Sequence, residues 1–339
     1  MLRFVLRNGT SWAPAGHEVA SSQFPIRVDS TTRRSAGNSA AIWALQVRDE
    51  STTLVLNSPR FVLKFDKVRA MITQWAYAGQ DLFLAGPKLN FFRASTDNDR
   101  GRNSMAEQWK ASGLHWLQHR VDSVEVSQIS RDTAQVKARV RIAPPVHRDR
   151  AFECFYTWSV RSNGAIALRV QGTPVGPWPA ELPRIGLIAS LPSRLNQIAW
   201  FGRGPGESYP DTCSATYVDR FTSTADGLRT NYLFPQENGN RSDCRWVQCT
   251  DVRGNGIAVI GELFNFNLSR NTPWEIDAAR HPFELKPRAD LTLTIDRRVN
   301  GIGSASCGPG VLQPYRCEPL PFDINLQWFP VQDGSPIAH

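Results

Sequence analysis

Apolar and polar residues alternate with a period of two along most of the chain after residue 50. Successive side chains of a β-strand point to opposite faces, so this period predicts half-buried strands. Short strands separated by turn residues recur at regular spacing, which indicates a mainly β chain with one large antiparallel twisted β-sandwich. We expect strands at 61–66, 68–75, 82–84, 121–129, 133–142, 152–160, 165–172, 184–191, 198–202, 247–251, 256–261, 291–296 and 324–329.

The N-terminal residues show the same alternation in two stretches, 2–6 and 19–26, joined by an ordered connection. This pattern predicts a hairpin, and two strands are too few to be stable alone. The hairpin is therefore expected to pack on something else. A polar stretch rich in Ser, Thr and Arg follows and is typical of a linker. We divide the chain into a hairpin at 1–28, a linker with a first strand at 29–50, and the sandwich at 51–335.

One segment has a helical pattern, at 103–114. Ser104 can cap its first turn, Glu107 lies three residues later as in a capping box, and Gly113 can end it. We expect this to be the only helix in the chain.

Composition and charge narrow the classes of protein. Of the 339 residues, 41% are hydrophobic. The 24 Gly and 23 Pro are spread along the chain, which is typical of many short strands joined by turns. The net charge is +8, but the basic residues do not cluster with aromatic ones, which argues against a nucleic-acid partner. No apolar run is long enough to span a membrane.

The cysteines and the N-terminus bear on the compartment. The six Cys form no Cys-x-x-Cys pair and have no His at zinc-ligand spacing, so we expect no metal and no cofactor. The segment Met1–Arg7 lacks the apolar core of a signal peptide. Reduced thiols and a cytoplasmic location are the resulting expectation.

A loop at 202–211 concentrates candidate chemistry, because three glycines and two prolines fix its backbone around four polar side chains. A second polar loop lies near residue 238. These loops either form a polar pocket over the concave face of the sandwich or make a network that fixes their own positions. The residues concerned are Arg203, Glu207, Tyr209 and Asp211 on the first loop, and Glu237, Asn238 and Arg241 on the second.

Three further features each admit two interpretations. Asn265 and Asn267 alternate with apolar residues and share one sheet face, which suits either sugar hydroxyls or solvent. The acidic turn 97–99 can bind a cation or cap the backbone. Cys307, in a Gly-rich loop, can be a nucleophile or a structural residue.

Four stretches occur in an order that resembles a known family: 86–101, 202–211, 233–241 and 303–310. Together they resemble the small-chain (C-terminal) domain of glycoside hydrolase family 2 β-galactosidases. The segment 12–20 resembles the end of the immunoglobulin-like domain that precedes this domain in those enzymes. The resemblance implies a galactose mutarotase-like supersandwich, preceded by a remnant of the immunoglobulin-like domain.

The resemblance also implies what this chain does not carry. In the family, the two catalytic glutamates lie on a TIM barrel, whereas Glu207, Asp211 and Glu237 match neither of them. A retaining glycosidase needs two carboxylates about 5–5.5 Å apart. We therefore expect no β-galactosidase activity from this chain alone. The loop that contains Cys307 aligns with a loop at the rim of the family's galactose site.

Three functions remain open. In the first, the chain is a carbohydrate-binding and assembly component that completes a barrel-containing large chain or forms a homodimer. Alternatively, it is a repurposed isomerase, cyclase or lyase acting on a small molecule, with Glu237, His281 and Glu207 as candidate acid–base residues, because a His and a Glu do this work in mutarotase-like folds. The third is a plain carbohydrate-binding module. The candidate ligand-binding residues are Arg203, Glu207, Tyr209, Asp211, Glu237, Asn238, Arg241, Asn265, Asn267 and Cys307.

Overall fold

The computed structural model describes residues 1–24, 43–101 and 104–334. These residues form two compact units, one containing 1–24 and the other beginning at 43. In the first unit, β1 (Leu2–Val5) pairs antiparallel with β2 (Glu18–Ser22), so the predicted hairpin is confirmed. Its large apolar side chains, among them Phe4 and Trp12, are 61% and 65% exposed. The hairpin therefore has almost no core of its own.

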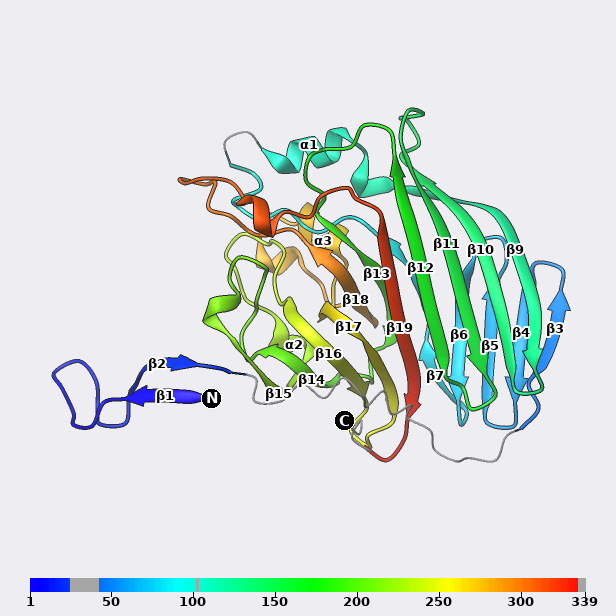
Figure 1. Cartoon of the computed structure of the whole chain (residues 1–339), viewed down its shortest axis with the longest axis horizontal. Coiled ribbons are helices and arrows are strands. Elements are labelled where there is room, and N and C mark those ends of the chain that lie inside the picture. The colour runs from blue at the N-terminus through cyan, green and yellow to red at the C-terminus, as the bar shows by residue number, and fades with distance from the viewer. Residues whose placement is uncertain (25–42, 102–103, 335–339) are drawn as a thin grey trace. The chain divides into compact units, whose positions relative to one another are not determined.

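The second unit contains a twelve-stranded antiparallel sheet (Figure 1). Its main path runs β15-β14-β16-β17-β19-β12-β11-β10-β9, and β13 pairs with β8 and β18 beside it. The strands are β8 (Ala85–Asn90), β9 (Gln118–Ser130), β10 (Thr133–Ala143), β11 (Ala151–Arg161), β12 (Ile166–Val175), β13 (Arg184–Pro192), β14 (Gln197–Gly204), β15 (Tyr217–Thr224), β16 (Arg241–Thr250), β17 (Gly256–Ser269), β18 (Asp290–Val299) and β19 (Phe322–Val331).

A five-stranded antiparallel sheet in the order β3-β4-β5-β6-β7 lies behind strands β9–β12 in Figure 1. It comprises β3 (Gln46–Glu50), β4 (Thr53–Ser58), β5 (Phe61–Asp66), β6 (Met71–Tyr77) and β7 (Gln80–Phe83). Side chains of both sheets share one core, for example Phe65, whose ring meets Trp158 edge-on at 4.8 Å. The predicted sandwich is thus confirmed.

The helices differ from the prediction. The first, α1 (Met105–Ala111), is capped as expected, because the Ser104 hydroxyl accepts a hydrogen bond from the Glu107 amide at 3.2 Å. It is not the only helix: α2 (Ala225–Leu228) and α3 (Pro273–Ala278) are also present. No helix of the described residues is both long and apolar enough to cross a bilayer.

Three strands were missed and one was misplaced. The strands β4, β8 and β15 were not predicted, and the strand expected at 68–75 begins only at Met71. Residues 67–70 form a turn instead, in which Asp66 accepts hydrogen bonds from the amides of Val68 and Arg69 and Ala70 has a φ of 49°. A side-chain-capped turn of this kind overrides the apolar pattern of the residues within it.

Candidate functional site

The two polar loops singled out in the sequence meet at Glu207. Its Oε2 accepts a hydrogen bond from the Gly239 amide at 2.7 Å, and its Oε1 accepts one from the Tyr232 hydroxyl. Burial, followed by this bond to Glu207, raises the pKa of Tyr232. Glu207 therefore joins the loop at 202–211 to the loop at 229–240.

The loop at 229–240 is anchored below by an ion-pair cluster. Arg184, at the start of β13, donates to Glu237 Oε1 at 2.5 Å and lies 3.3 Å from Asp296 Oδ2 on β18. All three side chains are at most 4% exposed. Burial by itself lowers the pKa of Arg184, but the charges of Asp296 and Glu237 raise it, so the guanidinium stays charged between its partners. Glu237 thus ties the loop to the sheet.

Tyr209 and Arg241 are buried beneath the two loops rather than at a surface. Tyr209 is 1% exposed, and burial, together with Glu237 and Glu207, raises the pKa of its hydroxyl. Arg241 is 3% exposed, donates to the Gly239 carbonyl at 2.9 Å and lies 5.5 Å from the Trp200 ring. These two predicted residues support the loops from within.

The remaining residues near the loops are also engaged. Arg203 donates to Asp243 Oδ2 at 2.5 Å and to the carbonyls of Cys213 and Thr216. The two asparagines of β17 do share one face, as the alternation predicted, while Phe266 between them is fully buried. Their side chains contact backbone carbonyls: Asn267 donates to Asn238 at 2.8 Å, and Asn265 to Asp296 at 3.4 Å.

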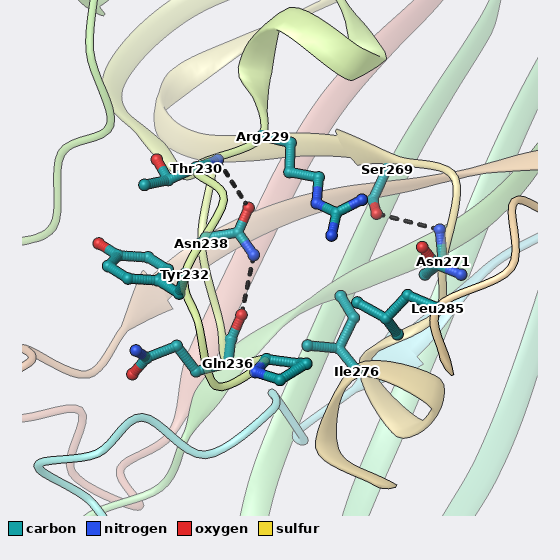
Figure 2. Close-up of a pocket in the computed structure, with 10 residues that line it drawn as sticks. Arg229, Thr230, Tyr232, Gln236, Asn238, Ser269, Asn271, Ile276 and Leu285 are labelled. Atoms are coloured by element: carbon teal, nitrogen blue, oxygen red, sulfur yellow. Dashed lines mark hydrogen bonds between the residues drawn. The ribbon is translucent and has the colours of Figure 1, made fainter. Parts of the chain in front are cut away.

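A small cavity lies where the second loop faces α3 (Figure 2). Asn238 braces the loop here, because its Oδ1 accepts from the Thr230 amide and its Nδ2 donates to the Gln236 carbonyl. The cavity volume of about 20 Å³ is the space of one water molecule, far below that of a sugar ring. Its lining is Arg229, Thr230, Tyr232, Pro235, Gln236, Asn238, Ser269, Asn271, Ile276 and Leu285. A second hollow, of about 580 Å³, lies on β14–β16 and contains none of the predicted residues.

A third loop, at 301–310, is held to the first loop and to the acidic turn 97–99. Asp211 accepts from the amides of Ile302 and Gly303 at 3.0 and 2.7 Å. Asn98 accepts from the Ser306 hydroxyl at 2.8 Å and donates to the Gly303 carbonyl at 2.8 Å. Cys307 follows at the exposed tip of this loop. Asp211 thus positions the loop that carries Cys307.

The acidic turn 97–99 has protein partners throughout. Asp99 forms a buried ion pair with Arg93 at 3.0 Å, and the Asp97 carboxylate accepts from Gln236 at 3.2 Å. Within the described part of the chain, no group of three His, Cys, Asp or Glu side chains has metal-site geometry. Asp99 also accepts a hydrogen bond from the Thr96 amide at 2.7 Å, which is the kind of contact that the capping interpretation expects.

The proposed acid–base pair lies apart in the contacts that the structure describes. His281 is exposed and stacks on Phe283 at 5.3 Å, whereas Glu237 is buried against Arg184. Sequence reasoning missed Arg184 and Asp296, which hold the loop. A signal was present, since both are charged residues inside runs otherwise typical of buried strands, where a charge needs a partner.

Comparison with known proteins shows which family the chain resembles. The family model described as β-galactosidase small chain matches residues 57–328. A β-galactosidase of Arthrobacter sp. (strain B7) is 30% identical over 93% of this chain and 31% of its own length. That of Vibrio cholerae is 30% identical over 88% of this chain and 28% of its own. The chain thus spans about a third of the length of these relatives.

A solved structure of galactose 1-epimerase from Lactobacillus acidophilus overlaps 86% of this chain and all of its own, with 9% identity and a TM-score of 0.40. That likeness is too distant to carry an argument. The family match covers most of the sandwich, and the fold is the large antiparallel β-sandwich that the resemblance implies. The chain belongs to the β-galactosidase small-chain family.

Proposed function

We propose that this chain is the small-chain component of a β-galactosidase and assembles with a larger chain that contains the catalytic barrel. The observation that carries the proposal is the partial coverage: full β-galactosidases match nearly all of this chain with less than a third of their own length. In this proposal the larger chain supplies the catalytic glutamates. The small chain supplies a preformed loop end, with the Cys307 loop facing the galactose.

The loop end has features of a docking surface. Leu233 is 91% exposed, yet the residues after it are fixed, since Arg100 lies 4.4 Å from the Phe234 ring and Gln236 bonds to Asp97. A loop whose backbone is already fixed loses little entropy on binding, so an exposed apolar side chain on it can contribute much of the binding energy. We infer that Leu233 inserts into the barrel chain.

The size of the cavity favours assembly over an independent enzyme. At about 20 Å³, the cavity beside the second loop admits no sugar, so the candidate loop residues act chiefly as a scaffold in this proposal. Carbohydrate contact then falls to the loop tip at Cys307. All six cysteines are unpaired, which supports a cytoplasmic location.

A binding experiment tests the proposal. The Arthrobacter β-galactosidase, truncated to remove the segment that matches this chain, is titrated with it and complex formation is followed by sedimentation velocity. We expect a complex that Leu233→Asp weakens at least about tenfold, equivalent to roughly 1.4 kcal/mol. Val252→Asp is the matched control, because Val252 is 87% exposed on the distant β16–β17 turn. Self-association alone, or equal effects of both variants, would overturn it.

A further inference from the structure

We propose that Asp296 is a neutral carboxylic acid in the folded protein in mildly acidic solution, and that its ionisation as the pH rises through neutrality releases the loop at 229–240 from the sheet. The cluster contains one buried cation and two buried carboxylates, so it has a net negative charge if both are ionised. Burying an uncompensated charge is costly, and taking up a proton removes the cost.

The hydrogen bonds decide which carboxyl group takes the proton. Glu237 accepts a hydrogen bond from Arg184 at 2.5 Å. Neither oxygen of Asp296 has a hydrogen-bond donor among the described residues, although Arg184 lies within ion-pair distance at 3.3 Å. A carboxylate without donors gains least from being charged. Asp296 is therefore the carboxyl group that takes up the proton.

The backbone around Asp296 leaves it little freedom to find other partners. A Cβ at Gly186 on the paired strand β13 would lie 1.8 Å from Asp296 Oδ1, so the carboxyl group sits directly over the main chain there. On the other side, Asn265 of β17 donates to the Asp296 carbonyl and not to its side chain. Asp296 is held in place by two strands.

The other titratable groups near the cluster come from three further segments. Tyr209, on the first loop, interacts electrostatically with Arg184 and Glu237. Cys317, in the segment before β19, interacts electrostatically with Asp296. Arg93 also interacts electrostatically with Tyr209, but it forms its own ion pair with Asp99 at 3.0 Å. Burial, opposed by Arg184 and reinforced by Glu237, raises the pKa of Asp296 to about 7.

When Asp296 ionises, the loop at 229–240 is the part of the cluster that moves. Arg184 and Asp296 lie on the paired strands β13 and β18, whereas Glu237 lies on a loop. Two charged carboxylates then compete for one guanidinium, and only Glu237 can reach solvent by a local movement. If the proposed function holds, this movement also loosens Leu233 and Phe234 and weakens assembly at alkaline pH.

Two measurements on the isolated chain test the proposal without any partner. Infrared difference spectroscopy between wild type and Asp296→Asn isolates the carboxylic C=O band of Asp296, which we expect to disappear with a midpoint near pH 7. Hydrogen exchange of the loop amides, including Thr230 and Gly239, is followed across the same range and corrected for intrinsic pH dependence. We expect about a tenfold rise in wild type and none in Asp296→Asn.

Two variants complete the design. Asp290→Asn is the matched control on the same strand, because Asp290 contacts Ser190 and Arg288 instead of the cluster, and its loop exchange is expected to follow wild type. Glu237→Gln frees Arg184 for Asp296 and moves the infrared midpoint to lower pH, which keeps the test available if Asp296→Asn does not fold. A band missing at acidic pH, a midpoint at the ordinary aspartate value, or equal loop exchange in wild type and Asp296→Asn overturns the proposal.

Discussion

Arg184 shows how one buried side chain can determine where a whole loop lies. It is 1% exposed and contacts carboxylates from a loop and from a neighbouring strand. Removing one member of a buried ion cluster leaves the others uncompensated, which costs far more than the net stabilisation by an intact pair. Loss of the Arg184 charge and a change of pH should therefore both alter the stability of the protein.

Replacement of Arg184 by Met is expected to lower the free energy of unfolding by about 3–5 kcal/mol, because it leaves Glu237 buried without the cation that donates to it. The measurement is urea denaturation. Arg169→Met is the control, since the Arg169–Asp323 pair is exposed to solvent, which screens the interaction, and its loss should have little effect on stability. Similar losses for both variants would contradict the structural role given to Arg184.

Stability is expected to fall as pH rises from about 4 to about 7. The folded protein raises the pKa of Asp296 from 3.8 to about 7, so it binds this proton more tightly than the unfolded chain does. The stabilisation is complete below the unfolded value, declines by about 1.4 kcal/mol per pH unit between the two pKa values, and is gone above the folded value. Urea midpoints at about pH 5 and about pH 8 measure it.

The Asp296→Asn variant should lose most of this dependence. Below about pH 4 a different trend applies to both proteins, because hydrogen bonds and ion pairs lower the pKa of Asp277 and Asp290 against the effect of burial. Their contribution is lost as pH falls. A wild-type midpoint that is equal at about pH 5 and about pH 8 would count against a protonated Asp296.

At the scale of elements, the sequence predicted the long strands well and the contacts between segments poorly. The strands at 133–142 and 152–160 alternate strictly because one face is buried, and such a pattern is local. The roles of Glu207, Glu237 and Asp211 depend on partners 32, 53 and 91 residues away, and no local pattern encodes that distance. The sequence therefore identified the two loops, but it could not decide whether they form a pocket or a network that fixes their own positions.

The missed helix α3 is a different case, since its signal is in the sequence. Thr272 and Glu275 form a complete capping box around Pro273, and Asp277 accepts from the Ser95 amide and pairs with Lys110 at 2.7 Å. The helix has only six residues, too few for its apolar period to be visible. Its caps and tertiary contacts stabilise it instead.

Thr272→Ala is expected to destabilise the protein by about 1 kcal/mol, because it leaves the Glu275 amide without its acceptor. Thr272→Ser keeps the hydroxyl and should behave like wild type. Thermal denaturation compares the three proteins. If alanine and serine variants were equally stable, the capping box would have no role in holding α3.

At the scale of the whole molecule, the described residues comprise a hairpin with little core and a sandwich with a large one. The hairpin and the sandwich belong to two separate compact units. Removal of residues 1–24 should therefore leave the melting temperature of the sandwich unchanged within about 2 °C. Calorimetry checks this, and a large drop would mean that the hairpin stabilises the sandwich directly.

The most direct test of the central claim is the rate of galactoside hydrolysis by three samples: this chain, a barrel-containing chain without its small-chain segment, and their mixture. The account predicts no turnover by this chain and a rate for the mixture well above that of the barrel chain alone. It also predicts that Leu233→Asp reduces this gain while Val252→Asp does not. Turnover by the small chain alone, or a mixture no faster than its parts, would contradict it.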